Sequence, residues 1–203
     1  MAYSGEFKRI IKNREIVGLL IRGSHVAGMR GRYEVLPKYS DWEEGRRIIA
    51  RAINNDGSIL DIGCANGFLL RCLQEWSGRK LVPYGIDIDY EGINAAQHLF
   101  RGQSKNFIGA SFDKIGLIAG LPKKFNFIYW TICDNWDLKK KRQLALVNET
   151  YKHVKPGGRL VLGFYKSRKY NDLRISGLRK VGFKLSAPVY ASHGHVAVVW
   201  ADK

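Results

Sequence analysis

The fold of this 203-residue chain is decided by the stretch Ser58-Ile59-Leu60-Asp61-Ile62-Gly63-Cys64-Ala65-Asn66-Gly67-Phe68-Leu69-Leu70. It passes from an apolar strand, through an acidic residue and a glycine turn, into an apolar helix. Gly63 and Gly67 allow the backbone to bend sharply. Main-chain N–H groups at the start of the helix, where the helix dipole is positive, can then face a ligand. The stretch therefore predicts a pocket for a nucleotide-type ligand.

The rest of the chain alternates between predicted strands and helices. Strands are expected at 59–62, 81–86, 107–109, 125–129 and 159–164, with helical segments between them. Such alternation predicts parallel strands with right-handed crossovers. Two further strand-like runs, 183–190 and 195–200, are joined by only four residues, so they must be antiparallel. The predicted fold class is α/β, with a doubly wound, mostly parallel seven-stranded sheet that ends in an antiparallel hairpin.

The N-terminal part differs in character from the remainder. Apolar residues recur every three or four positions over 4–22, which predicts one basic amphipathic helix, and a glycine-containing loop is expected to follow up to residue 39. Ser40 and Glu43 match a capping box that would open the next helix. We therefore expect an N-terminal extension or lid over residues 1–39 and one domain over 40–203.

The positive charge is concentrated at the two ends of the chain. Residues 1–32 contain seven basic and two acidic side chains, residues 138–203 contain 15 and three, and residues 57–137 are neutral. Basic surfaces around a neutral centre favour a polyanionic partner, because phosphate neutralisation drives nucleic-acid binding. A solvated charged surface explains the same composition equally well.

Several classes of protein are disfavoured by composition. No apolar run approaches the roughly 20 residues that cross a bilayer, and the first residues do not resemble a signal peptide. We expect a soluble cytoplasmic protein that does not interact with a membrane. Cys64, Cys72 and Cys133 form no CxxC motif, so neither a disulfide framework nor a metal site is expected.

Two acidic residues lie where parallel sheets place their ligands. Asp61 ends the first predicted strand and Asp87 ends the second, 20 residues after Gly67. A carboxylate at the second position can accept both ribose hydroxyls. The alternative for Asp87 is to cap the next helix, and Asp89 is a neighbouring candidate for the ribose contact.

The order Asp-x-Gly-x-Ala-x-Gly, followed by Asp87 and the terminal hairpin, resembles the class I S-adenosylmethionine-dependent methyltransferases, with Ala65 in place of the usual middle glycine. The resemblance implies S-adenosyl-L-methionine as cofactor, with a methyl group at Ala65 that takes up room beside it. Asp61 would face its amino group and Asp87 its ribose. Ala110 or Ser111 would stand in place of the acid of the usual Gly-Asp pair. Ser111 would hydrogen-bond the adenine and Phe112 would pack on its face, or backbone contacts would hold the adenine instead. The implied cofactor-binding set is Asp61, Gly63, Cys64, Ala65, Gly67, Asp87, Ile88, Ser111, Phe112 and Trp130.

The same resemblance places the methyl acceptor at residues 129–136, after the fourth strand. The Asn/Asp-Pro-Pro-Tyr/Phe signature of nitrogen methylation is absent there. Asp134 is the candidate general base or acceptor-positioning group. Cys133 invites comparison with 5-methylcytosine enzymes, but it lacks their adjacent proline, and an ordinary cysteine is favoured. The candidate substrate-binding residues are Tyr39, Trp136 and the basic, tyrosine-flanked Lys166, Arg168 and Lys169.

The leading hypothesis is a methyltransferase acting on a structured RNA, which the basic N-terminal and C-terminal regions would bind. A small-molecule methyltransferase, with residues 1–45 as a lid, is the main alternative. A non-catalytic nucleic-acid-binding module on the same fold is a third. A nicotinamide dehydrogenase is a fourth, because such enzymes place an acid at the position of Asp87.

Overall fold

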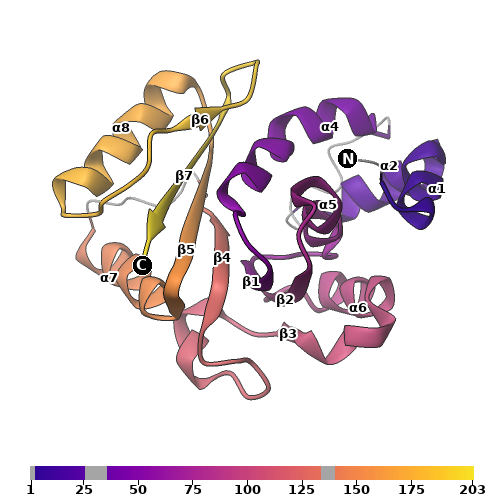
Figure 1. Cartoon of the computed structure of the whole chain (residues 1–203), viewed down its shortest axis with the longest axis horizontal. Coiled ribbons are helices and arrows are strands. Elements are labelled where there is room, and N and C mark those ends of the chain that lie inside the picture. The colour runs from indigo at the N-terminus through magenta and orange to yellow at the C-terminus, as the bar shows by residue number, and fades with distance from the viewer. Residues whose placement is uncertain (1–2, 26–35, 134–139) are drawn as a thin grey trace.

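The computed structural model describes residues 3–25, 36–133 and 140–203, and its centre is a seven-stranded sheet (Figure 1). The strand order is β3-β2-β1-β4-β5-β7-β6. Strands β1 to β5 are parallel, whereas β7 runs antiparallel to both β5 and β6. This is the predicted fold class. The strands are β1 (Gly57–Ile62), β2 (Leu81–Asp87), β3 (Phe107–Gly109), β4 (Phe125–Thr131), β5 (Val154–Tyr165), β6 (Val189–Tyr190) and β7 (Val196–Asp202).

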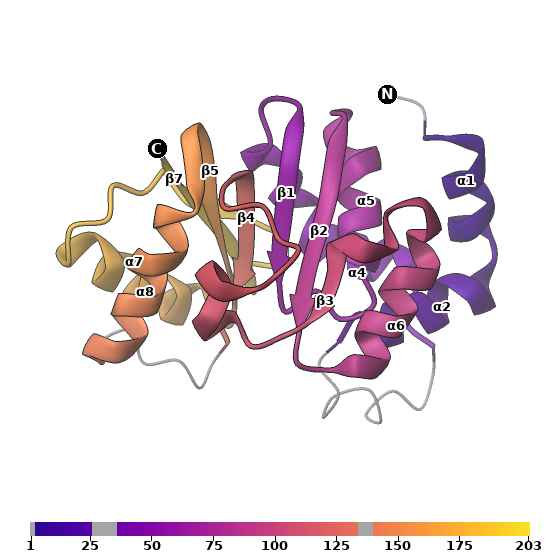
Figure 2. The ribbon, with the colours of Figure 1, turned by 90° about the horizontal axis from the view of Figure 1, so that it is seen from below.

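Helices cover both faces of the sheet (Figures 1 and 2). No helix in the three described ranges is long and apolar enough to cross a membrane. The helices that pack on one face are α1 (Gly5–Lys12), α2 (Arg14–Gly23), α4 (Tyr39–Arg46), the 3-10 helix η1 (Arg47–Ala52), α5 (Phe68–Ser77) and α6 (Tyr90–Leu99). On the other face lie η3 (Phe112–Leu117), α7 (Lys141–Lys152) and α8 (Arg168–Lys180), while η2 (Arg101–Asn106) leads into β3.

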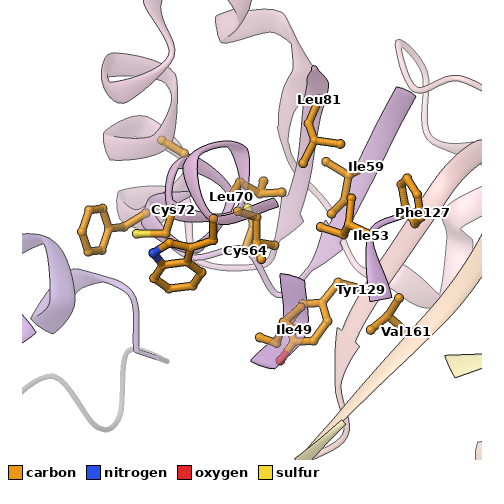
Figure 3. Packing of buried hydrophobic residues seen from close by; sticks show 14 of the residues in the cluster. Ile49, Ile53, Ile59, Cys64, Leu70, Cys72, Leu81, Phe127, Tyr129 and Val161 are labelled. Atoms are coloured by element: carbon orange, nitrogen blue, oxygen red, sulfur yellow. The ribbon is translucent and has the colours of Figure 1, made fainter. Parts of the chain in front are cut away.

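Successive strand residues supply two separate hydrophobic cores, because side chains of a strand alternate between the faces of a sheet. Ile59 belongs to the core beneath α4 and α5, and its neighbour Leu60 belongs to the core beneath α7 and α8. Figure 3 shows the first core, where Cys64 of the glycine turn lies near Leu70 of α5. The turn is therefore fixed between the sheet and its helices.

The N-terminal region forms two helices where one was predicted. Asn13 ends α1 and also caps α2, because its side-chain oxygen accepts a hydrogen bond from the Ile16 N–H at 3.0 Å. A side chain that satisfies the backbone locally competes with a continuous helix. Phe7 of α1 is fully buried, and the Ser4 hydroxyl donates to Glu75 of α5 at 2.6 Å. Both helices thus pack on the domain.

Three other local predictions were wrong. Helix α4 begins at Tyr39, so Ser40 lies inside it and donates to Asp41 instead of capping. The strand expected at 159–164 begins earlier, at Val154, so 155–158 lies within β5, where Gly157 and Gly158 are hydrogen-bonded to Lys203 just after β7. The run 183–190 forms a strand only at Val189–Tyr190.

Candidate active site

A cavity of about 570 Å³ opens at the carboxyl ends of the parallel strands. Its volume lies within the usual range for small-molecule sites. Helix α4 and the residues that follow α2 close one side of it. Of the predicted cofactor residues, those that line the cavity are Asp61, Gly63, Cys64, Asp87, Ile88, Ser111, Phe112 and Trp130.

Asp61 is a buried acid at the end of β1, with only 3% of its surface exposed. No hydrogen-bond donor from the described part of the chain reaches its carboxylate. Burial, and secondarily the charge of Asp87, raise the pKa of Asp61 to about 8. A buried acid without internal donors is stabilised by a cationic ligand. Asp61 therefore marks where such a ligand group belongs.

Asp87, at the end of β2, is held by the main chain and is half-buried. Its carboxylate accepts hydrogen bonds from the N–H groups of Ala65 at 2.8 Å and Asp89 at 2.9 Å, one on each oxygen. Each carboxylate oxygen can accept a second bond, so two hydroxyl groups can still be bound. The cap of α6 is Asp89, which accepts from the Glu91 N–H at 3.2 Å. The alternative role of Asp87 as a helix cap is thus wrong.

Five N–H groups of the glycine turn and the start of α5 are hydrogen-bonded within the chain and so are not available to a ligand. Those of Gly63 and Cys64 donate to the Ile86 carbonyl, and that of Gly67 donates to the Cys64 carbonyl. The Ala65 N–H is bound to Asp87, and the Phe68 N–H donates to the Asn66 side chain at 3.1 Å. These five donors are used to tie the turn to β2 and α5.

Ala65 and Gly67 support the turn from outside the cavity. Ala65 adopts the left-handed conformation, with φ of 47°, and is only 3% exposed. Its methyl group does not line the cavity, so the expected crowding of the ligand is wrong. Gly67, with φ of 72°, caps α5, and a side chain there would press on Phe100 at 3.1 Å.

The cavity lining includes an aromatic pair and a group of hydroxyl side chains. The rings of Phe112 and Trp130 have centroids 4.8 Å apart and offer an apolar wall to a planar group. The Tyr129 hydroxyl lies 3.0 Å from that of Thr131 and 3.2 Å from that of Tyr165. Burial raises the pKa of Tyr129, so this hydroxyl stays protonated.

The predicted acceptor-site residues have mixed outcomes. Asp134 and Trp136 lie outside the described residues. Tyr39 does not line the cavity, because its ring packs against Phe7 and Trp42 and its hydroxyl accepts from the Trp76 indole N–H at 3.1 Å. Tyr39 is thus a packing residue.

The ends of β4 and β5 form the remaining edge of the cavity, with Thr131, Ile132, Cys133 and Tyr165 in its lining. Cys133 is exposed there, and the buried Arg174 of α8 donates to the carbonyls of Ile132 at 3.0 Å and Cys133 at 2.9 Å. The predicted basic residues Lys166, Arg168 and Lys169 are exposed immediately after Tyr165, which lines the cavity.

Within the three described ranges, no group of acidic, histidine or cysteine side chains could hold a metal ion. The residues at the cavity fit S-adenosylmethionine instead. Asp61, which accepts no hydrogen bond from the described residues, can bind an ammonium group. Asp87 has free acceptor sites for ribose hydroxyl groups. Phe112 and Trp130 form an aromatic wall for a purine.

Comparison with known proteins agrees with this site. Residues 59–158 match the family model described as "Methyltransferase domain". A search of the curated proteins finds no significant sequence match. The chain therefore contains a methyltransferase domain, and its fold is that of class I S-adenosylmethionine-dependent methyltransferases. It is an enzyme whose methyl donor is S-adenosyl-L-methionine.

Solved structures show the same fold at low sequence identity. An S-adenosylmethionine-dependent methyltransferase from Aquifex aeolicus is 20% identical, with a TM-score of 0.55 and coverage of 91% of this chain and 97% of that one. Fibrillarin from Aeropyrum pernix, solved with natively bound S-adenosyl-L-methionine, is 15% identical, with a TM-score of 0.58 and coverage of 79% and 76%. The fibrillarin pre-rRNA processing protein of Methanococcus jannaschii is 18% identical, with a TM-score of 0.58 and coverage of 79% and 77%.

Proposed function

We propose that this methyltransferase acts on a structured RNA. The observation that carries the proposal is the basic rim, which we define as Lys166, Arg168 and Lys169. All three side chains are exposed, and they directly follow the cavity residue Tyr165. An RNA held by this rim would have its bases beside the place where the methyl donor binds.

Aromatic rings accompany the cations of the basic rim. The Lys166 ammonium lies 5.7 Å from the ring centre of Tyr170, and the Arg168 guanidinium lies 4.4 Å from that of Tyr190. Tyr170 is 38% exposed and can stack on a base. Cations for phosphates together with rings for bases are typical of proteins that bind unpaired nucleotides. The fold similarity to fibrillarins, one of which is a pre-rRNA processing protein, also favours RNA.

In the proposed complex, the chain's own residues bind and orient the methyl donor. Asp61 would bind its amino group, Asp87 its ribose hydroxyls, and Phe112 and Trp130 would enclose its adenine. The cofactor supplies a methyl group that is already activated on a sulfonium. The protein therefore contributes mainly proximity, alignment and exclusion of water. Asp134 stays the proposed acceptor-positioning group.

The test compares two charge-matched triple variants. In the first, Lys166, Arg168 and Lys169 are changed to glutamine. In the second, Lys80, Lys123 and Lys124 are changed to glutamine, because these exposed residues lie just before β2 and β4, at the opposite edge of the sheet. Binding of a fluorescently labelled RNA hairpin is measured by anisotropy over a salt series, and methyl transfer is measured with a tritiated donor.

We expect the first variant to bind RNA more weakly and to show a smaller salt dependence. The slope of log affinity against log salt should fall by about 0.7 to 0.9 for each phosphate that the variant no longer neutralises. The second variant should resemble the wild type. Equal reductions of affinity in both variants, or hairpin binding that is insensitive to salt, would contradict the proposal.

A small-molecule acceptor is the second candidate, and it is favoured by the docking of α2 at the cavity. Ser24 and His25, just after α2, line the cavity wall. The Asn66 amide of the glycine turn donates to the Leu20 carbonyl of α2 at 2.8 Å. On this reading, the N-terminal helices enclose a small acceptor. Methyl transfer to a small molecule at the same rate in the wild type and in the basic-rim variant would support this second candidate.

A further inference from the structure

Arg46, at the end of α4, places a guanidinium group in the cavity wall. The side chain is half-buried between two aromatic rings. Its guanidinium carbon lies 4.8 Å from the ring centre of Trp42 and 5.4 Å from that of Tyr165. Because Tyr165 ends β5 and is hydrogen-bonded to Tyr129 of β4, the group is held by both a helix and the sheet. A planar cation held in this way is oriented before any ligand arrives.

Within the described parts of the chain, most donors of Arg46 are unused. A guanidinium has five N–H donors, and Arg46 makes one hydrogen bond to a described residue, to the Trp42 carbonyl at 3.4 Å. Across residues 3–25, 36–133 and 140–203, no carboxylate lies within ion-pair distance of it. Neighbouring arginines are paired: Arg47 with Glu43 at 2.6 Å, and Arg71 with Glu75 at 2.8 Å.

The charges that line the cavity are arranged asymmetrically. Asp61 and Asp87 lie at the ends of β1 and β2, and Arg46 is the permanent cation among the described residues that line the cavity. His25 also lines it, but burial lowers the pKa of its imidazole, and the charge of Arg46 lowers it further. A ligand that carries both an ammonium and a carboxylate matches this arrangement.

We infer that Arg46 binds the carboxylate of the methionine part of S-adenosylmethionine. The ammonium and the carboxylate of that methionine part are attached to the same carbon atom. If the ammonium is bound by Asp61, the carboxylate needs a cation in the same cavity, and Arg46 is the cation that the fold supplies. The inference rests on the identity of the methyl donor and not on the proposal that the acceptor is RNA.

The test uses two ligands that differ in the amino-acid part. S-adenosylhomocysteine carries the carboxylate, whereas 5′-methylthioadenosine has the same nucleoside and no amino acid. Both are titrated by calorimetry into the wild type, Arg46→Gln, Arg46→Lys and the control Arg51→Gln, which changes an exposed arginine of the adjoining η1. Unchanged affinity for 5′-methylthioadenosine shows that a variant is folded and that its nucleoside site is intact.

For Arg46→Gln we expect the affinity for S-adenosylhomocysteine to fall by about 10- to 100-fold, which corresponds to the loss of a hydrogen-bonded charge pair. Its affinity for 5′-methylthioadenosine should change by less than about threefold, and Arg46→Lys should recover part of the affinity. The Arg51→Gln variant should behave as the wild type.

Two results would overturn the inference. The first is Arg46→Gln binding S-adenosylhomocysteine as tightly as the wild type. If that variant then binds the RNA hairpin more weakly, Arg46 recognises an acceptor phosphate instead. The second is an equal reduction of affinity for both ligands, which would mean that Arg46 only supports the cavity wall. Neither result bears on whether RNA is the acceptor, since that is tested at the basic rim.

Discussion

The buried acid Asp61 should make the stability of the ligand-free enzyme depend on pH. Its pKa is raised from an ordinary value near 3.8 to about 8, first by burial and then by the charge of Asp87. Between these two values the native state holds one proton more than the unfolded state. Stability that Asp61 contributes at low pH is therefore lost as the pH rises through the pKa of the folded protein.

The size of this effect follows from the proton difference. One proton corresponds to about 1.4 kcal/mol per pH unit. Between about pH 5.5 and 7.5, the wild type should lose at most about 2 to 3 kcal/mol of its free energy of unfolding relative to Asp61→Asn, which cannot ionise. Urea denaturation of both proteins at the two pH values measures this difference. The exposed Asp113→Asn variant is the control, and it should follow the wild type.

Ligand binding should reverse the protonation of Asp61. When S-adenosylhomocysteine brings its ammonium to the cavity, the carboxylate form is favoured, so close to one proton should be released per ligand bound near pH 7. Calorimetry in buffers of different ionisation enthalpy counts that proton, and Asp61→Asn should release none at this site. An equal difference in free energy of unfolding between the wild type and Asp61→Asn at both pH values would contradict a raised pKa of Asp61.

Two further predictions concern the support of the cavity. Ala65→Gly should raise the free energy of unfolding by up to about 1 kcal/mol, because glycine adopts the φ of 47° without strain; a loss of stability in urea denaturation would contradict this. Arg174→Met should lower the free energy of unfolding by about 3 kcal/mol, because the Ile132 and Cys133 carbonyls lose their donor. The same variant should slow methyl transfer more than it weakens binding of S-adenosylhomocysteine. Arg179→Met, at an exposed site on the same helix, is the control, and equal effects would refute the second prediction.

The sequence predicted those parts of the site that depend on the ends of strands. Asp61 and Asp87 could be placed because strand length and the following turn fix which residue lies at the carboxyl edge of a parallel sheet. Their surroundings could not be predicted in the same way. The five occupied N–H groups of the glycine turn depend on how the turn sits against β2, which is set by packing and not by local pattern.

Arg46 shows a different limit of sequence reasoning. It lies in a helix whose residue pattern indicates only a buried side around Trp42, and its partner Tyr165 is 119 residues further along the chain. The two residues meet because the strand order brings the end of β5 beneath α4. No local signal in either segment points to this contact. The break between α1 and α2 at Asn13 could not be predicted either, because an asparagine is compatible both with a continuous helix and with a helix cap.

The occupied donors of the glycine turn have a consequence for competition among metabolites. ATP and nicotinamide dinucleotides share a ribose and an adenine with the methyl donor, but they carry phosphate groups. Five N–H groups at this turn are already bonded to Ile86, Cys64, Asn66 and Asp87, and the buried Asp61 would repel an anion once it is ionised. Abundant nucleotides should therefore be poor inhibitors. S-adenosylhomocysteine keeps every group that the cavity recognises, so the enzyme's turnover should respond to the ratio of donor to product and not to the energy charge of the cell.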